Sequence, residues 1–469
     1  MKFIVDNVIV SESDGVAAIR KKTAERLGAH ATGLRVEVIR KRWIRSEKGG
    51  AVCLSVIAET NEFLRSTSSF SRFEEPVIDT EPLAWKCRPV VVGFGLSGIA
   101  ASLYLAKRGL KPIILERGLG LEHRPLVATK KNPLTRDGEG SVLAQLGSLL
   151  CLDNFDPRLR ALLEEEGIVF SGPEAQRFLD PTKVRSILTT LHKKIVSYGG
   201  EILFNANYLG MKKRFGKIKG VLYENKGETK LIKTNKVLLA FGACDDVFYI
   251  GTGVPALPQA FNECIYGKKT VDERYPLYVS ESSLKIHSSR SLLITGLRGA
   301  RVVDIGATTN MCVQAYNFDG KGRHVQSLLG VEITGEEGET ICKNAFDASK
   351  PTRIPCSSVA DFYAKRAPLR LGTIKPEKIA DIRLENFSKI LGPGPAKRLA
   401  AAFSQFCKNH PYLDSKDAIF EGLFLLAGCE SSEPRNLDGA WASCVPASEC
   451  MDFAAKATAG FKAALRLCE

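Results

Sequence analysis

Two spacings of apolar residues alternate along this chain, and each predicts its own kind of element. Uninterrupted apolar runs at residues 90–92 and 112–115 predict short, buried strands. Between them, residues 99–108 carry apolar side chains at helical spacing and end before Gly109. The pattern therefore predicts a strand, a helix and a second strand within the roughly 30 residues of a βαβ unit.

The turn between the first strand and the helix has the spacing G-x-G-x-x-G, formed by Gly93, Gly95 and Gly98. The first glycine allows a tight turn, the second lets backbone approach a pyrophosphate, and the third lets helix and strand pack closely. The helix start presents unpaired N–H groups and the positive end of its dipole. Glu116 ends the second strand, where a carboxylate can accept both ribose hydroxyls. The pattern predicts a dinucleotide site; a glycine turn that binds nothing is the alternative.

Residues 1–84 have a separate pattern, that of a small α+β domain. Their alternation predicts a strand, a helix and two more strands, at residues 3–10, 14–27, 34–45 and 51–59. A polar and proline-bearing stretch then leads into the βαβ unit. We therefore expect the second domain to begin at residue 85.

Helix and strand patterns continue beyond the βαβ unit to about residue 250. Asp180 and Pro181 predict the start of a helix, as N-cap and first helical residue. Residues 201–205 predict a strand, residues 217–233 a β-meander, and residues 236–243 a buried strand that ends in small residues. We expect residues 85–250 to form a Rossmann-like domain.

From residue 251 to 385 the sequence changes to short strands and turns, which predicts an inserted, β-rich α+β domain. Two helices follow, at residues 395–409 and 454–466. We expect residues 386–469 to complete the Rossmann-like domain. The predicted fold class is α/β, with the inserted domain and the small N-terminal domain attached.

Composition narrows the classes of protein to which this chain can belong. Its 469 residues exceed a single compact core and predict two or three domains. The hydrophobic content of 44% and charged content of 25% are typical of globular proteins. Because no run of 18 apolar residues and no signal-peptide pattern occurs, we expect a cytoplasmic protein without a membrane partner. The oligomeric state stays open.

Cysteines and basic residues are numerous but define no site. The 13 cysteines include no C-x-x-C pair and no zinc-like cluster, so we expect buried thiols and no metal. In residues 211–236, nine basic residues outnumber Glu224 and Glu228 by seven, half of the net charge of +14. We interpret this excess as the solvated outer face of the meander, with a phosphate-binding surface as the alternative, and expect no nucleic-acid partner.

The βαβ unit, the later buried strand, the inserted domain and the Ala-rich last helix together resemble two-domain FAD flavoproteins. More narrowly, the whole chain is similar to an uncharacterised family of FAD-dependent dehydrogenases with a small extra N-terminal α+β domain. The best local matches are residues 90–118, 199–205, 239–242 and 417–422. The resemblance implies an FAD-dependent oxidoreductase of a small-molecule substrate, with NAD(P)H or that substrate as electron donor.

The resemblance also implies roles for particular residues. The glycine turn, with Leu96 and Ser97, would bind the pyrophosphate of FAD, and Glu116 the adenosine ribose. Arg117 follows Glu116 in the matched segment, and Arg124 would reach a cofactor phosphate or form a structural ion pair. Three further candidates would lie at the adenine edge, beside the adenine half and along the ribityl chain: Tyr208, Gly242 and Gly138. None of the six histidines lies in a motif, so no catalytic residue is predicted.

Three segments depart from the family's pattern. Residues 141–146 are bulky and apolar where the family keeps small residues, and residues 296–299 lack the family's cysteine. Before the last helix, residues 444–448 replace a glycine-rich turn and include Val445 and Pro446, which bring a β-branched side chain and remove an N–H. The adenine half of the site thus matches the family better than the flavin half. A scaffold that binds a nucleotide or a partner without catalysis is the alternative.

Overall fold

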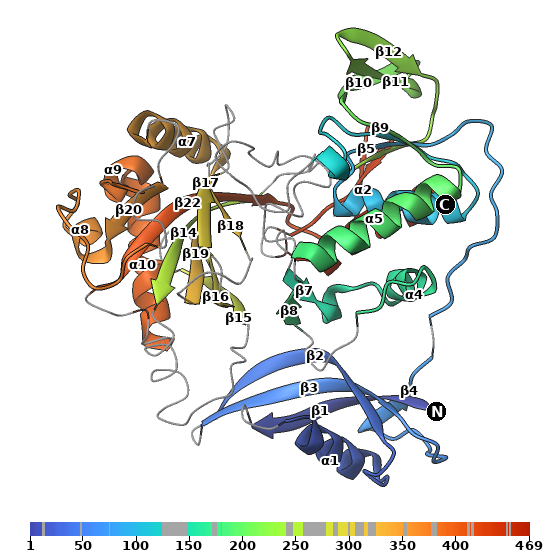
Figure 1. Ribbon diagram of the computed structural model, residues 1–469, viewed down its shortest axis with the longest axis horizontal. Helices are drawn as coiled ribbons and strands as arrows, with labels where there is room; N and C mark the ends of the chain where they lie inside the picture. Colours follow the sequence, from blue (N-terminus) through green and yellow to red (C-terminus); the bar gives the residue numbers. More distant parts are fainter. Residues whose placement is uncertain are drawn as a thin grey trace. The chain divides into compact units, whose positions relative to one another are not determined.

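The structure is a computed structural model of the chain (Figure 1). It describes residues 1–11, 15–46, 49–74, 76–123, 149–170, 176–179, 181–240, 247–256, 278–284, 289–298, 301–304, 314–317, 325–349, 354–376, 382–409, 413, 417–446, 449 and 452–469. The chain divides into two compact units, Met1–Asp79 with Leu150–Arg177 and Thr80–Leu149 with Phe178–Glu469.

The first unit contains a four-stranded antiparallel sheet of order β2-β3-β1-β4 and one helix packed on it. Its elements are β1 (Lys2–Ser11), α1 (Val16–Leu27), β2 (Arg35–Ser46), β3 (Gly49–Glu59) and β4 (Phe70–Arg72). Buried valines of β1 and β3, such as Val5 and Val56, share a core with Leu27 of α1. The predicted helix and strands are all present, with ends within two residues of those expected.

A later segment also belongs to the first unit. It contains η2 (Leu152–Asn154) and α4 (Pro157–Glu165), between the paired strands β7 (Leu149–Cys151) and β8 (Gln176–Phe178). Asp156 caps α4 by accepting the Arg158 N–H at 2.9 Å, and Arg160 of α4 forms an ion pair with Glu37 of β2. The sequence analysis placed this segment in the second domain and predicted no helix there, because its place in the fold depends on long-range contacts such as the ion pair of Arg160 with Glu37.

The first sheet of the second unit has six strands in the order β23-β24-β13-β5-β6-β9. Its strands are β5 (Val90–Val92), β6 (Ile113–Leu115), β9 (Glu201–Leu203), β13 (Val237–Leu239), β23 (Arg435–Leu437) and β24 (Ala440–Ala442). All neighbouring pairs are parallel except β23 with β24. The chain winds from β5 through β6 to β9 and then returns to the other side of β5, so the end of β5 is a topological switch point.

Helices and a meander flank this sheet. The helices are α2 (Leu96–Lys107), α5 (Pro181–Ser197) and α11 (Phe453–Cys468), and α2 packs on both others. The meander consists of β10 (Ala206–Arg214), β11 (Lys217–Asn225) and β12 (Glu228–Ile232), and its inner side chains share a core with β5 and β13. A 3₁₀ turn, η1 (Leu121–His123), follows β6. The predicted α/β class with a Rossmann-like sheet is confirmed.

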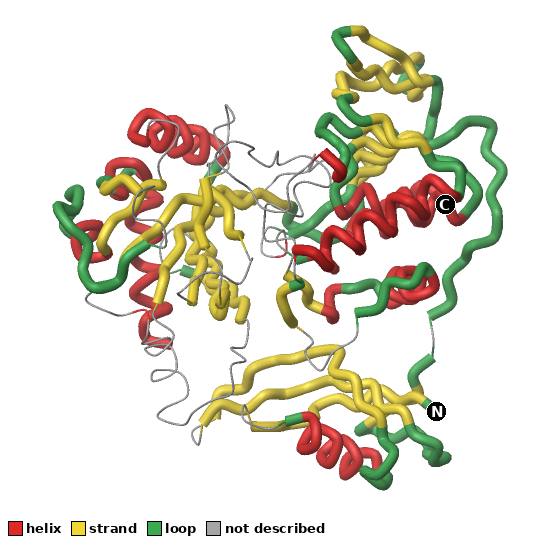
Figure 2. The backbone as a smooth tube through the Cα atoms, viewed as in Figure 1, coloured by secondary structure: helices red, strands yellow, loops and turns green. Residues whose placement is uncertain are grey.

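The second sheet of this unit has seven strands in the order β15-β16-β19-β14-β22-β20-β21. They are β14 (Val247–Ala256), β15 (Tyr278–Ser283), β16 (Arg290–Arg298), β19 (Val325–Ile333), β20 (Ile354–Ser358), β21 (Ile382–Leu384) and β22 (Ile419–Gly428). The helices α7 (Gly335–Ser349), α8 (Val359–Tyr363), α9 (Phe387–Leu391) and α10 (Pro393–Asn409) pack on strands of this sheet. Figure 2 shows helices in red beside its yellow strands. A separate hairpin pairs β17 (Arg301–Asp304) with β18 (Gln314–Asn317).

This sheet extends further along the chain than the predicted inserted domain, which was expected to end at residue 385. Leu399 and Phe403 of α10 and Leu423 of β22 lie in one core with β14 and β19. The strand-rich region therefore ends with β22, and the Rossmann-like sheet resumes at β23. The amphipathic pattern of α10 predicted its existence but not its partner.

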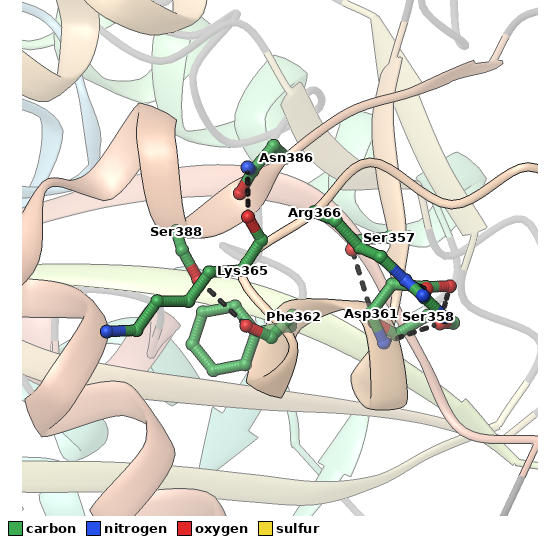
Figure 3. A network of polar contacts seen from close by, with 8 residues as sticks. All are labelled: Ser357, Ser358, Asp361, Phe362, Lys365, Arg366, Asn386 and Ser388. Carbon is green, nitrogen blue, oxygen red and sulfur yellow. Dashed lines mark hydrogen bonds and ion pairs between the residues drawn. The ribbon is translucent and has the colours of Figure 1, made fainter.

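A polar network fixes α8 at the edge of this sheet (Figure 3). Ser358 caps the helix by accepting the Asp361 N–H at 3.0 Å, and Arg366 donates to Asp361 Oδ1 at 2.6 Å. Hydrogen bonds from Ser358 and Arg366 hold the pKa of the Asp361 carboxyl below its usual 3.8. Asn386 and Ser388 donate to the carbonyls that end the helix, those of Lys365 and Phe362. The whole network serves to anchor the helix.

Among the described residues, no helix combines the length and apolarity needed to cross a bilayer. The same residues contain no group of three or more His, Cys, Asp or Glu placed to hold a metal ion.

Candidate nucleotide-binding site

The glycine turn at the end of β5 depends on two of its glycines for its shape. Gly93 has a φ of 96°, a conformation that residues with a Cβ rarely adopt. A Cβ on Gly98 would lie 1.9 Å from the carbonyl oxygen of Gly93. Neither position accepts a side chain, because the turn folds back on the first turn of α2.

The first turn of α2 has no side-chain cap. Its N-cap, Gly95, has extended backbone (φ −77°, ψ −174°), and no acidic residue lies in the first turn. Leu96 is buried, and the Ser97 hydroxyl donates to the Lys456 carbonyl at 2.7 Å. The side chains of Leu96 and Ser97 therefore serve packing, and what this helix start can offer a ligand is its backbone N–H groups and its dipole.

Glu116 lies beside the glycine turn and is only 2% exposed. Its Oε2 accepts the Phe94 N–H at 2.8 Å, and its Oε1 accepts the Gly118 N–H at 2.7 Å. A buried carboxylate is costly unless it is hydrogen-bonded, and these two amides supply that compensation. Each carboxylate oxygen can accept more than one hydrogen bond. The structure thus brings Glu116 and the glycine turn together, joined through Phe94.

Phe94 is a site residue that the sequence reasoning missed. Its side chain is fully buried, and its ring meets those of His192 on α5 and Phe204 after β9 edge to face, at 5.8 and 6.2 Å between centroids. This packing fixes the backbone N–H that orients Glu116. The signal in the sequence was an aromatic residue between two glycines, where a solvated turn would carry a polar residue.

The last helix packs directly on the first turn of α2. A Cβ on Gly460 of α11 would lie 1.8 Å from the Ser97 carbonyl oxygen, and Phe461 meets Tyr104 of α2 edge to face. The start of α11 is capped by Asp452, which is 2% exposed and accepts the N–H groups of Ala454 and Ala455 at 3.1 and 3.4 Å. Unlike α2, this helix begins with a carboxylate at its positive end.

Residues 444–446, which begin the segment where the sequence departs from the resemblance, continue from β24. Cys444 is fully buried, and the Cys429 N–H donates to the Val445 carbonyl at 2.8 Å. Cys429 also forms an isolated parallel bridge with Pro446. Ala447 and Ser448 lie outside the described residues. Up to Pro446, this backbone is therefore engaged in pairing with Cys429, the residue that follows β22.

The remaining predicted residues divide into those the structure places and those it does not describe. Arg117 is exposed next to Glu116, and Tyr208 lies half-buried on β10, where burial raises the pKa of its phenol above the usual 10.0. The other predicted cofactor-binding residues lie outside the described residues: Arg124, Gly138 and Gly242. For all of these, cofactor binding stays a prediction.

Comparison with known proteins finds distant relatives. No protein-family model matches the chain. An uncharacterized protein of Clostridium beijerinckii is 25% identical over 496 aligned positions, which cover 90% of this chain and 89% of that one.

Solved structures give loose matches at low identity. The flavin-dependent brominase Bmp2 has 10% identity and a TM-score of 0.35, covering 81% of this chain and 79% of its own. A geranylgeranyl bacteriochlorophyll reductase-like protein of Thermoplasma acidophilum has 14% identity and a TM-score of 0.36, covering 81% and 77%. A flavoprotein/dehydrogenase of Cytophaga hutchinsonii has 11% identity and a TM-score of 0.34, covering 81% and 79%. Likenesses of this degree transfer no function, which must come from the chain's own residues.

Proposed function

We propose that this chain is an FAD-dependent oxidoreductase of a small-molecule substrate. The glycine turn from Gly93 to Gly98 would bind the pyrophosphate, and Glu116 would bind the adenosine ribose. The observation that carries the proposal is the buried carboxylate of Glu116, fixed by the Phe94 N–H of that same turn, beside a helix start without a side-chain cap.

The chemical groups of the site complement an ADP moiety. Ribose hydroxyls are donors and suit a carboxylate, whereas the pyrophosphate is an anion and suits the N–H groups and dipole at the start of α2. A purely structural role for Glu116 explains its bonds to Phe94 and Gly118 but leaves the bare N-cap unexplained. Gly95 has a backbone conformation open to any residue, and serine or aspartate there would cap α2 more strongly.

The isoalloxazine of bound FAD would supply the redox chemistry, and the chain would supply binding and orientation. In this proposal Arg117, Arg124, Gly138, Tyr208 and Gly242 complete the cofactor site as the resemblance implies. Either NAD(P)H or the substrate provides the electrons. We also propose a cytoplasmic location for the protein.

One observation favours a second candidate, a nucleotide-binding scaffold without redox activity. By the resemblance, the start of the last helix approaches the flavin end of the cofactor. Here Asp452 caps that helix and places a negative charge there. A site that kept only its adenine half would bind ADP about as well as FAD.

The visible spectrum of the purified protein and calorimetric titration with FAD and ADP separate the two candidates. The oxidoreductase predicts flavin absorbance, carried over or regained with added FAD, and FAD affinity at least about tenfold above that of ADP, equivalent to about 1.4 kcal/mol. Equal affinities for FAD and ADP would favour the second candidate, the nucleotide-binding scaffold. Binding of neither would refute both.

Two matched glycine variants test whether the turn binds the pyrophosphate of FAD. Gly95→Ala adds a methyl group where the cofactor would approach, and we expect at least about a tenfold loss of FAD affinity. Gly15→Ala is the control, because Gly15 is also the bare, extended N-cap of a 12-residue helix. Each substitution costs under about 1 kcal/mol of stability. Equal FAD affinity in both variants would remove the turn from the site.

A further inference from the structure

The β10–β12 meander carries more positive charge than its neighbours neutralise. Lys213 pairs with Asp438 at 2.9 Å, and Lys230 pairs with Glu228 at 3.4 Å. Other basic side chains of the meander are exposed and have no acidic partner among the described residues: Lys212, Arg214, Lys217, Lys219, Lys226 and Lys233.

The two faces of the meander differ in chemistry. On the inner face, Tyr223, Ile218 and Val221 join the core of the Rossmann-like sheet. On the outer face, Leu222 of β11 lies opposite Leu231 of β12, which is 40% exposed. The outer face thus presents Leu231, with Leu222 half-buried beside it and basic residues further along the same strands.

The hairpin from β10 to β11 adds an exposed aromatic ring. Its two loop residues, Phe215 and Gly216, have φ of 53° and 72°, as in a type I′ turn. Phe215 is 89% exposed, and the guanidinium of Arg214 lies 5.2 Å from its ring centroid. Asparagine, aspartate or glycine suits that position, so neither the turn nor the core explains a phenylalanine there.

The second hairpin of the meander provides a direct contrast. Its loop residues, Lys226 and Gly227, have φ of 54° and 79°, the same geometry as the first. A polar residue thus fills the position that Phe215 fills in the first hairpin. The aromatic ring therefore marks one end of the meander, and at that end Arg214 pairs with Lys217 in the strand register.

We propose that this end of the meander binds the surface of a bilayer that contains anionic phospholipid. Arg214, Lys217 and Lys212 would face the phosphate groups, and the exposed ring of Phe215 would enter the boundary between headgroups and acyl chains. The exposed Leu231 on the same sheet favours a lipid over a nucleic acid, which offers bases for stacking but no apolar layer. The expectation of no membrane partner rested on the lack of a predicted membrane-spanning segment. Binding to a bilayer surface does not need such a segment.

Co-sedimentation of the full chain with vesicles tests the proposal. We expect binding to vesicles of phosphatidylcholine and phosphatidylglycerol in equal parts, no binding to phosphatidylcholine alone, and release at high salt. Each lysine near an anionic surface is worth about fivefold in affinity, so Lys212→Glu with Lys217→Glu should weaken binding by at least about 25-fold.

Phe215→Asn and Lys226→Asn form a matched pair, since both place asparagine at the same position of a type I′ turn. Phe215→Asn should weaken vesicle binding about tenfold while leaving the thermal midpoint equal or higher, because asparagine tolerates this backbone. Lys226→Asn lies at the other end of β11, well beyond a Debye length, and should stay within about twofold of the wild type.

Three outcomes would overturn the proposal: no vesicle binding at low salt, equal loss in the Phe215 and Lys226 variants, or tighter binding to a short DNA duplex or an acidic protein than to the vesicles. Flavin absorbance measured on the same samples keeps this test separate from the proposed enzymatic function.

Discussion

Helices α2 and α11 pack against each other, yet they begin in opposite ways. The N-cap of α2 is Gly95, without a side-chain bond, whereas that of α11 is Asp452, which accepts two backbone N–H groups. Both starts carry the positive end of a helix dipole. The cap decides which of them can receive an external anion, so only α2 offers a place for a phosphate. For the proposed FAD site, this difference favours binding of the adenine half over the flavin half.

The largest effect is expected at the contact between the two helices. Gly460→Ala would place a Cβ 1.8 Å from the Ser97 carbonyl oxygen, and since that neighbour is backbone, we expect a loss of at least about 3 kcal/mol in the free energy of unfolding. Gly338→Ala in α7 is the control, because the nearest atom there is a side-chain methyl at 3.4 Å. Replacing this helical glycine should be neutral or stabilise by up to about 1 kcal/mol. Similar denaturation midpoints for the two variants would show that the helices do not touch at Gly460.

Removing the N-cap of α11 should have the next largest effect on stability. Asp452→Ala removes the acceptor of two N–H groups at a buried helix start, and we expect a loss of about 1–2 kcal/mol in the free energy of unfolding. Asp452→Asn keeps an N-capping oxygen and should lose less. Chemical denaturation of the three proteins measures this order. An alanine variant as stable as the wild type would mean that the cap contributes nothing.

Substitutions at two serines of α2 test how this uncapped helix packs. Ser97→Ala removes the hydrogen bond to the Lys456 carbonyl and should cost about 1 kcal/mol, with FAD affinity unchanged because the side chain faces α11. Ser102 is fully buried on the same helix, and its hydroxyl has no partner among the described residues. Ser102→Ala should therefore be neutral or stabilising. A loss of FAD affinity in the Ser97 variant would place its side chain at the cofactor instead.

The smallest effect on stability is expected at a third helix start, that of α8. This effect depends on pH. Hydrogen bonds from Ser358 and Arg366 lower the pKa of Asp361 in the folded chain. The stability that Asp361 contributes is therefore complete above the unfolded pKa of about 3.8 and is lost as the pH falls below it. The difference in unfolding free energy between wild type and Asp361→Asn should shrink on acidification through that range. A constant difference would show that the carboxylate contributes no charge-dependent stability.

The sequence predicted what local spacing determines. The strand, glycine turn, helix and Glu116 follow one another within 30 residues, so their geometry depends on short-range constraints. The meander and both late helices were also recognised from periodicity. These elements needed no knowledge of distant contacts.

Long-range packing was beyond the reach of the same reasoning. Nothing near α10 reveals that it packs on the seven-stranded sheet, and nothing near α4 reveals its ion pair with Glu37. The Asp452 cap was within reach, since an aspartate stands before an Ala-rich helical run.

The hydroxyl of Ser97 finds its acceptor 359 residues further along the chain. At ribosomal speeds of about 5–20 residues per second, the first turn of α2 would wait roughly 20–70 seconds for α11 to be synthesised. During that interval the nascent glycine loop lacks the surface against which it is finally held. Loading of the proposed nucleotide is thus expected to follow, rather than accompany, translation.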